Sequence, residues 1–343
     1  IPAPPLPHHT HPRRCPSKRV AMPKYTHSGA SPLTQAAAFI FSNTLLSTFL
    51  AMVVVPLYLS PRAFTIYFLL PYYALDVVFR WSTGDGFQWP FFARHFPVFT
   101  ALRRHIGLSA VLSEGLEATK GEPTAQYVFA IFPHGVGSDF RVLLQGMLPD
   151  LFPGYHLKVR SLAASVLFYL PFIRELTLWT GCISASRSVA DKALVDGRTV
   201  IVLPGGEAEQ LLTKRGREIV YVKSRKGFIR LAIKHKVPVV PVYVFGSNDL
   251  FETSDSYYEA RHWLMKKYGV CIPLSRGLLG SLCPLPVKNT VVFGEPVAYH
   301  GAKWVKEGGE ATREEVDRAH ADFMERLEAL FEKEKGKYGC ADR

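Results

Sequence analysis

A histidine and an aspartate follow a buried-type apolar stretch, and together they could activate a hydroxyl group. The stretch at 127–132 reads YVFAIF, and His134 falls in the turn directly after it, with Asp139 five positions further on. An aspartate beside an imidazole fixes its tautomer and raises its basicity, which is the arrangement that deprotonates a hydroxyl. If a helix begins within the turn, the two side chains can meet. The spacing alone is weak, because a histidine that caps a turn gives the same pattern.

A glycine pair with two glutamates follows a second apolar stretch. Residues 203–212 read LPGGEAEQLL. Gly205 and Gly206 permit close approach of the backbone, and their N–H groups could hold an anion. Glu207 and Glu209 would open the helix that follows. No Gly-Lys-Ser/Thr sequence comes next, so this is not a Walker loop, and an ordinary strand-to-helix turn is the alternative.

The sequence directly after this turn is strongly basic. Residues 213–236 hold nine lysines and arginines against one glutamate, a net charge of +8 out of +12 for the whole chain. Residues 1–21 hold the other +4, which leaves the remaining sequence neutral. The simpler interpretation is a charged surface that faces solvent and binds no ligand. Its place beside the glycine pair favours a small phosphorylated ligand, and nucleic acid is not indicated because no aromatic residues interleave for stacking.

Short apolar stretches that alternate with amphipathic ones supply the elements that must position these residues. They predict an α/β fold with a central sheet. The expected strands are 127–132, 199–203, 239–245 and 290–293, and the expected helices are 188–196, 225–236, 256–268 and 311–335. The last helix has a capping box at Thr312 and Glu315 and an apolar stripe typical of core packing.

Two long apolar runs precede this α/β region. Residues 33–60 contain no charge, and residues 63–79 contain only Asp76. About 20 apolar residues suffice for a helix to cross a bilayer. Basic residues flank the pair on both sides, so both ends are expected in the cytosol and the runs form a membrane hairpin. A re-entrant hairpin and two buried core helices are the alternatives.

The composition fits a folded chain in a reducing compartment. Of 343 residues, 48% are hydrophobic and 20% charged, which excludes a disordered protein. Five scattered cysteines without C-x-x-C spacing indicate reduced thiols, with neither a zinc site nor a disulfide framework. Residues 1–21 are rich in Pro, His and Arg and are expected to be a disordered tail, with Met22 as the physiological start.

In their order, the three chemistry-bearing segments resemble the type-2 acyl-CoA:diacylglycerol acyltransferase family, with its monoacylglycerol and wax-alcohol relatives. The matching elements are Phe132-Pro133-His134-Gly135, then Pro204-Gly205-Gly206-Glu207-Ala208-Glu209, then Arg225-Lys226-Gly227-Phe228. Segments 180–187, 240–251 and 293–297 are also similar to family segments. The resemblance covers roughly residues 33–339, and it implies a mixed central sheet flanked by helices after the membrane hairpin.

Two positions depart from the family pattern. The family commonly has histidine where this chain has Phe132, which we interpret as tolerated. Asp139 is not usual in the type-2 family. His134 with Asp139 looks instead like the hallmark of the broader glycerolipid acyltransferase superfamily, which includes the lysophosphatidic acid acyltransferases. Gly181 with Arg187 also fits that superfamily, whereas the Pro-Gly-Gly element favours the neutral-lipid branch.

The resemblance implies an acyl-CoA-dependent O-acyltransferase that makes triacylglycerol from diacylglycerol. His134 would be the general base, and either Asp139 or Glu209 would orient it. Backbone N–H groups near Gly135 or the glycine pair would stabilise the oxyanion, and the basic run would hold the CoA phosphates. The residues expected at the substrates are Phe132, Pro133, Gly135, Arg187, Pro204, Gly205, Gly206, Arg225, Lys226 and Gly227.

Several expectations about the setting follow from the same resemblance. No metal or cofactor is expected, with acyl-CoA as co-substrate. The location would be the endoplasmic reticulum membrane or lipid droplets, and homo-oligomers are left open. The expected organisation is a tail at 1–32, a membrane hairpin at 33–80 and a cytosolic acyltransferase domain at 81–343.

Other functions remain as alternatives at this stage. The acceptor could be monoacylglycerol, a fatty alcohol or a lysophospholipid instead of diacylglycerol. An acyl-enzyme on Cys182 is a covalent rival, although no basic partner is adjacent to it in sequence. No G-x-S-x-G elbow is present, which argues against a serine hydrolase. From another class, the chain could be a membrane lipid-binding protein without catalysis.

Overall fold

A seven-stranded sheet forms the centre of the molecule in a computed structural model that describes residues 28–79, 86–305 and 311–342. The strand order is β1-β9-β6-β2-β5-β3-β4, and all neighbours are parallel except β6 and β9. The strands are β1 (Ser109–Val111), β2 (Val128–Phe132), β3 (Val159–Ala163), β4 (Cys182–Ser184), β5 (Thr199–Val202), β6 (Val239–Phe245) and β9 (Thr290–Phe293). The predicted mixed central sheet is therefore confirmed.

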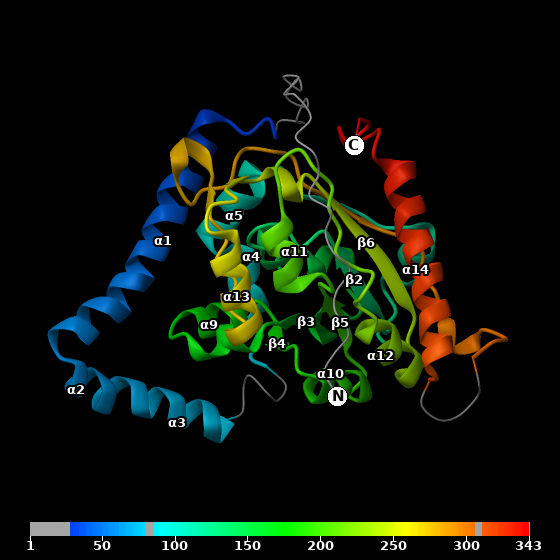
Figure 1. Ribbon diagram of the computed structural model, residues 1–343, viewed down its shortest axis with the longest axis horizontal. Coiled ribbons are helices and arrows are strands. Elements are labelled where there is room, and N and C mark those ends of the chain that lie inside the picture. The colour runs from blue at the N-terminus through cyan, green and yellow to red at the C-terminus, as the bar shows by residue number, and fades with distance from the viewer. Residues whose placement is uncertain (1–27, 80–85, 306–310, 343) are drawn as a thin grey trace.

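Helices cover both faces of this sheet, which explains why its strands are apolar on both sides. One core joins the sheet to α10 (Arg187–Val195), α12 (Gly227–His235) and α14 (Arg313–Glu334), and Figure 1 shows α14 along one side of β6. The second core joins the opposite face to α6 (Glu114–Thr119), α7 (Asp139–Leu144) and α8 (Leu148–Leu151). The capping box that begins α14 at Thr312 is confirmed, with the Glu315 N–H donating to the Thr312 hydroxyl.

The strand register brings the two sequence motifs to one edge of the sheet. β2 lies between β5 and β6 and runs parallel to both, with Val128 opposite Val200 on one side and Val239 on the other. The turn with His134 follows β2, and the glycine pair follows β5. Carboxyl ends of parallel strands meet at the same edge, which is where ligands bind in open α/β sheets.

The remaining elements connect this framework. Short helices and turns lie between the strands, and a small two-stranded sheet packs nearby. They are α4 (Pro90–His95), α5 (Pro97–His105), η2 (His156–Lys158), η3 (Ser165–Tyr169), α9 (Ile173–Trp179), α11 (Gly206–Leu212), η4 (Ser247–Asp249), β7 (Glu252–Thr253), α13 (Tyr258–Tyr268), β8 (Ser275–Arg276), η5 (Leu278–Gly280) and η6 (Tyr299–Gly301).

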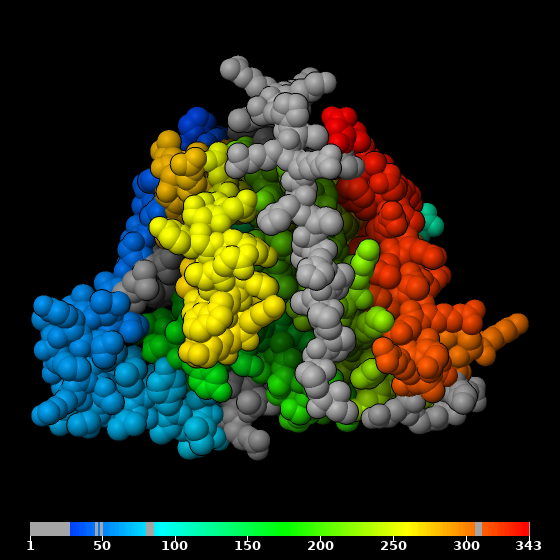
Figure 2. Space-filling model, in the orientation of Figure 1, coloured from blue at the N-terminus to red at the C-terminus, as the bar shows by residue number. Residues whose placement is uncertain are grey.

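Two apolar helical segments flank the α/β body, and the first of them packs along α5. α1 (Pro32–Leu59) ends where Ser60 and Pro61 turn the chain, and α2 (Pro61–Phe64), η1 (Thr65–Leu69) and α3 (Leu70–Phe79) then run on as one helical segment. Figure 1 shows α1 and α3 as two arms of an L, and Figure 2 shows the surface of α2 and α3 standing out from the body.

The outer segment has the character of a membrane helix. Within the described residues, one helical segment, Pro61–Phe79, is long and apolar enough to cross a bilayer, and it has no buried part. Large apolar side chains of both arms face outward, among them Tyr58, Leu59, Tyr67, Val77 and Val78. The hairpin at 33–80 stays a prediction. The expected tail at 1–21 lies outside the described residues.

Candidate active site

The turn after β2 holds His134 in a fixed backbone geometry. The ring of Phe132 is fully buried and packs in the core against Phe323 of α14, with ring centroids 6.2 Å apart. The Phe132–Pro133 peptide bond is cis. Gly135 has φ +66°, and a Cβ there would collide with the hydroxyl of Ser247. This position therefore requires glycine, which explains the His-Gly sequence at the end of the strand.

The imidazole of His134 has one nitrogen available as a base. Nδ1 lies 3.1 Å from the Gly135 carbonyl oxygen, so we assign the proton to Nδ1 and leave Nε2 as the acceptor. The hydroxyl of Ser138 lies 3.2 Å from Nδ1 and 3.1 Å from Nε2. The Nδ1–H bond and the Nε2 lone pair diverge within the ring plane, so one oxygen nearly equidistant from both nitrogens is aligned with neither. Ser138 therefore contacts the ring without forming a nucleophile–base pair.

His134 is uncharged at neutral pH. The pKa of its imidazole is lowered to about 4, chiefly by burial; the Gly135 carbonyl opposes this shift and the charge of Arg141 adds to it. The side chain lies in the wall of a cavity. A neutral histidine beside a cavity meets the first requirement of a general base, which must be unprotonated when the substrate binds.

Within the part of the chain that the structure describes, neither Asp139 nor Glu209 forms a hydrogen bond with the imidazole of His134. Glu209 is 1% exposed, and its Oε1 accepts the backbone N–H of His134 while Oε2 accepts the Tyr221 N–H at 2.6 Å. Burial raises the pKa of the Glu209 carboxyl to about 7. Burial also raises the pKa of Asp139 to about 6, opposed by a hydrogen bond from its own backbone N–H. Glu209 thus fixes the peptide of His134, and not its ring.

The glycine pair makes room for that glutamate. A Cβ at Gly205 would lie 2.7 Å from the Cβ of Glu209 and still closer to its carboxylate. Gly206 has φ +52°, and its N–H donates to the Leu203 carbonyl oxygen at 3.1 Å. The Gly206 N–H is therefore engaged within the turn. The packing of Glu209 is a firmer reason for the Gly-Gly sequence than the anion site that the sequence suggested.

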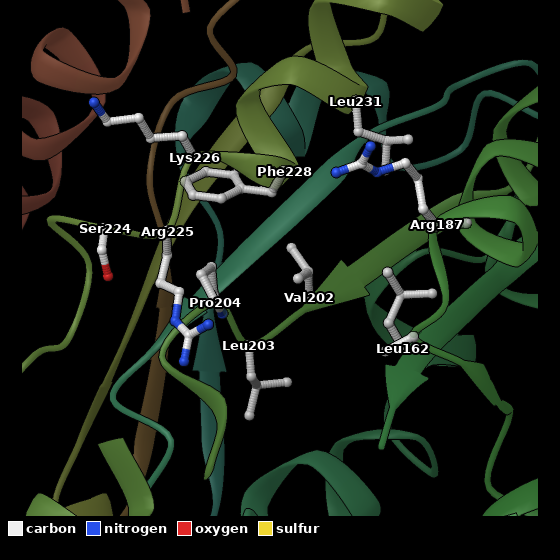
Figure 3. A pocket seen from close by; sticks show the side chains of 13 residues that line it. Leu162, Arg187, Val202, Leu203, Pro204, Ser224, Arg225, Lys226, Phe228 and Leu231 are labelled. Carbon is white, nitrogen blue, oxygen red and sulfur yellow. The ribbon is translucent and has the colours of Figure 1, made fainter. Parts of the chain in front are cut away.

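Two cavities adjoin at this edge of the sheet, and His134 lines the first of them. The first has a volume of about 570 Å³ and combines polar side chains (His134, Arg141, Glu207, Gln210) with an apolar wall (Val166, Leu167, Leu170). The second has about 540 Å³ and is bordered by Arg187, Ser224, Arg225 and Lys226. They share six lining residues: Leu162, Ala185, Val202, Leu203, Pro204 and Arg225. Figure 3 shows Arg187 and Arg225 on either side of Val202. The combined space suits a ligand with one anionic end and one apolar end.

Fewer cations of the basic run at 213–236 are available to bind a ligand than the sequence suggested. Four of its nine cations pair with carboxylates from other segments: Lys214 with Asp255, Arg215 with Glu252, Lys226 with Asp317 and Lys234 with Asp191. Of these nine cations, only Arg225 and Lys226 line either of these cavities, and Arg187 from α10 joins them. The structure therefore narrows the candidate phosphate site to these three residues.

The other substrate residues expected from the sequence divide into two groups. Pro204, Gly206, Arg187, Arg225, Lys226 and Gly227 line a cavity, whereas Phe132, Pro133, Gly135 and Gly205 do not line either one and act by shaping the two turns. No sequence pattern indicated Ser138, Arg141 and Gln210, nor the apolar wall. These residues reach the site only through the packing of α7, α11 and η3, which no local spacing encodes.

Cys182 is poorly placed for a covalent intermediate. Its thiol is fully buried, and burial raises its pKa, although Arg141 donates a hydrogen bond to the sulfur and opposes the shift. A protonated buried thiol is a weak nucleophile. Within residues 28–79, 86–305 and 311–342, no cluster of three His, Cys, Asp or Glu side chains is arranged to hold a metal ion.

Comparison with known proteins identifies the family. The sequence profile described as "Diacylglycerol acyltransferase" matches residues 64–343. The chain belongs to the diacylglycerol acyltransferase family. It is 29% identical over 289 residues to human "Diacylglycerol O-acyltransferase 2", which covers 78% of this chain and 70% of the relative. It is 31% identical over 324 residues to human "2-acylglycerol O-acyltransferase 3", which covers 88% of each.

A further relative and one solved structure are also similar to this chain. "Diacylglycerol O-acyltransferase 2B" of Umbelopsis ramanniana is 28% identical over 268 residues, covering 73% of this chain and 71% of the relative. The crystal structure of the 1-acyl-sn-glycerophosphate acyltransferase PlsC from Thermotoga maritima aligns with 84% of this chain and 96% of its own, at 18% identity and a TM-score of 0.39. The family and its relatives make this chain an acyltransferase, which supports an enzyme over a non-catalytic lipid-binding protein.

Proposed function

We propose that the chain transfers an acyl group from acyl-CoA to the free hydroxyl of diacylglycerol, with His134 as general base. The observation that carries this proposal is the place of His134. Its neutral imidazole lines a cavity that has an apolar wall and adjoins a second cavity bordered by Arg187, Arg225 and Lys226. Acyl-CoA matches these two parts of the site, because it has phosphates at one end and a hydrocarbon chain at the other.

The proposed reaction is a direct attack on the thioester. Nε2 of His134 accepts the hydroxyl proton of the acceptor as its oxygen bonds to the thioester carbonyl carbon. The C–S bond then breaks, and CoA leaves as a thiolate that takes the proton from the imidazolium. The products are an ester and free CoA thiol. Because burial makes the imidazolium costly, the proton passes on rapidly instead of resting on the ring.

Two further groups support this reaction. Glu209 accepts the His134 N–H and so holds the backbone that carries the base. Arg141, from α7, lines the same cavity as His134, and its positive charge adds to the lowering of the His134 pKa. We assign to Arg141 the stabilisation of the negative charge that develops on the thioester oxygen. The reaction as proposed uses no resident metal or cofactor.

The setting of the reaction follows from its substrates. Diacylglycerol and long acyl chains reside in lipid, so the α/β body would act at the cytosolic surface of the endoplasmic reticulum membrane, with α1 to α3 inserted as a hairpin. Lipid droplets are a second surface of the same kind. The outward-facing apolar side chains of Pro61–Phe79 support this arrangement.

Monoacylglycerol is the second candidate acceptor. The human relative that covers 88% of this chain is a 2-acylglycerol O-acyltransferase, and its identity is slightly higher than that of the human diacylglycerol O-acyltransferase. The chemistry at His134 would be identical, because both acceptors offer a glycerol hydroxyl. The two differ only in how much hydrocarbon the apolar part of the site must hold.

An acceptor assay on membranes tests the proposal. Microsomes that carry the chain receive labelled acyl-CoA with diacylglycerol, monoacylglycerol, a fatty alcohol or lysophosphatidate. We expect labelled triacylglycerol from diacylglycerol, and none above background from His134→Ala. His156→Ala is the matched control, since His156 also contacts a nearby carbonyl oxygen but lines neither cavity. Faster transfer to another acceptor would overturn the choice of diacylglycerol.

A further inference from the structure

A buried arginine joins the apolar helix α3 to α9. Arg174 is 2% exposed, and its Nη2 lies 2.8 Å from Oε1 of Glu175. Its Nη1 lies 3.9 Å from Oδ1 of Asp76, and its guanidinium carbon lies 3.7 Å from the ring centroid of Tyr72. Tyr72 and Asp76 belong to α3, about 100 positions earlier in the chain. We call Tyr72, Asp76, Arg174 and Glu175 the Arg174 clasp.

Neighbouring contacts tie the same two segments together. The Tyr72 hydroxyl donates to Oε2 of Glu175 at 2.6 Å, and the Tyr73 hydroxyl donates to the Tyr169 carbonyl oxygen. The rings of Phe68 and Phe172 stack with centroids 6.0 Å apart. Figure 1 shows α9 beside α3, between that helix and the sheet. The outer helical segment is therefore joined to the body by directional contacts as well as by apolar surface.

The energetics of such a cluster favour a role in positioning. A buried ion pair contributes little net stability, because removing both charges from water costs about as much as their attraction returns. Removing one partner is strongly unfavourable, because the other charge stays buried. The contacts of Arg174 with Asp76 and with the face of Tyr72 therefore favour the orientation of α3 that makes them.

The segment that the clasp holds forms the apolar wall beside His134. Residues 165–169 form η3, which leads directly into α9, and Val166, Leu167 and Leu170 line the cavity. Tyr169 between them accepts the hydrogen bond from Tyr73 of α3. The opposite surface of α3 carries exposed apolar side chains, including Val77 and Val78. Helix α3 thus contacts the outside of the wall whose inside faces the reacting groups.

We propose that Arg174 is a positioning residue that fastens α3 to the cavity wall, and that this contact sets how the lipid acceptor reaches His134. The inference rests on the proposed acyl transfer for its effect on the acceptor. Its structural part, the docking of α3 on residues 165–175, is independent of that function. Loss of the clasp releases the wall, so the apolar part of the cavity loses its shape while the cationic part keeps its own.

Two variants on different helices test the clasp. Arg174→Met removes the charge from α9 and keeps an unbranched apolar side chain, and Asp76→Ala removes the partner on α3. Glu175 is left intact, because its carboxylate also accepts the Phe172 N–H at the start of α9. Asp150→Ala is the matched control, since it breaks the ion pair with Arg94, which also joins distant segments but lies outside both cavities.

The kinetic readout separates positioning from folding. At saturating acyl-CoA we expect the acceptor KM to rise roughly five- to ten-fold in both variants, with the acyl-CoA KM changed less than about two-fold. Arg174→Lys should restore part of the loss because it keeps the charge. A merely structural role would lower the fraction of active enzyme and hence kcat, without changing the acceptor KM. An unchanged acceptor KM in folded Asp76→Ala enzyme would overturn the proposal.

Hydrogen exchange supplies a readout that does not need activity. Amides of residues 165–172 should exchange faster in Arg174→Met and Asp76→Ala than in the unsubstituted protein or Asp150→Ala. Unchanged exchange in both clasp variants would show that α3 does not hold the wall, whatever the kinetics. If the unsubstituted enzyme acylates none of the acceptors, the proposed function fails. Faster exchange in the clasp variants would then still support the docking of α3, and unchanged exchange would refute it.

Discussion

The chemistry of His134 depends on where its imidazole lies. The ring donates from Nδ1 to the Gly135 carbonyl, which leaves Nε2 for the substrate, and burial keeps it uncharged. The sequence identified this histidine from its place after an apolar strand. It could not show that Ser138 lies over the ring or that Glu209 binds the backbone N–H, because both contacts depend on how the chain turns after residues 132 and 203.

The lowered pKa of His134 predicts an unusual pH profile. A protonated ring cannot accept a proton, so kcat/KM falls as the pH drops through the pKa of the folded enzyme, which is about 4 instead of the ordinary 6.5. We therefore expect no change in kcat/KM from pH 6 to pH 8 that is due to His134. The check is kcat/KM measured from pH 4.5 to pH 8.5.

Glu209 needs a control in that experiment. Its raised pKa of about 7 places its ionisation inside the same window. Glu209→Gln removes this titration while keeping one oxygen that can accept the His134 N–H. An acid limb near pH 7 that disappears in Glu209→Gln belongs to Glu209. An acid limb near pH 6.5 that persists in the variant would show that His134 has an ordinary pKa, contrary to its burial.

At the scale of elements, strands with a continuous apolar run were predictable, whereas β3, which contains Arg160 and Ser161, and the three-residue strands were not. The strands at 239–245 and 290–293 occur as predicted in β6 and β9, and the long carboxy-terminal helix agrees within two residues at each end. The edge strands β1 and β4 have three residues each, which is too few to form a recognisable apolar pattern in the sequence. The order of the strands in the sheet could not be predicted from the sequence either, because strand pairing depends on contacts between distant segments.

The turn between β5 and α11 gives a prediction at this scale. Gly205→Ala places a methyl group against Glu209, so the glutamate must move and its bond to the His134 N–H is disturbed. We expect a loss of about 1–3 kcal/mol in the free energy of unfolding and a lower kcat. Denaturant unfolding and steady-state kinetics measure both effects.

Gly336→Ala is the matched control for this turn. A Cβ at Gly336 meets no atom within 4 Å, and its φ is not positive. This variant should keep the stability and rate of the unsubstituted protein. If Gly205→Ala behaves in the same way as Gly336→Ala, then the glycine pair does not serve to seat Glu209.

At the scale of the molecule, charge and apolar surface are distributed differently than the sequence suggested. The run at 213–236 is balanced in part by carboxylates that lie far away in sequence, such as Asp191 and Asp317. Only contacts between distant segments reveal this pairing, so a count of charges along the chain overestimates the free cationic surface. The apolar outer surface of α1 to α3, in contrast, follows directly from the uncharged sequence at 33–79.

That outer surface predicts attachment to lipid. Val77 and Val78 of α3 are 76% and 71% exposed, so Val77→Lys with Val78→Lys should not disturb the packing of the body. If α3 enters the bilayer, two lysines there are unfavourable by roughly 2–4 kcal/mol each. We expect the double variant to move from the membrane pellet to the supernatant on carbonate extraction.

A valine outside the helical arms provides the control for that extraction. Val195 at the end of α10 is 73% exposed, and Val195→Lys should leave the chain in the pellet. If the Val77→Lys, Val78→Lys variant stays in the pellet as fully as Val195→Lys, α3 does not anchor the protein.

General-base catalysis by His134 is tested by comparing catalysis with acyl-CoA binding in purified His134→Ala enzyme. We expect kcat for acyl transfer to fall by at least about 100-fold, since a general base contributes roughly that much or more. The Kd for acyl-CoA should stay within about two-fold, because Arg187, Arg225 and Lys226 lie in the adjoining cavity and are unchanged. A variant that binds acyl-CoA normally and keeps kcat within a few-fold of the unsubstituted enzyme would contradict the assignment of His134 as the base.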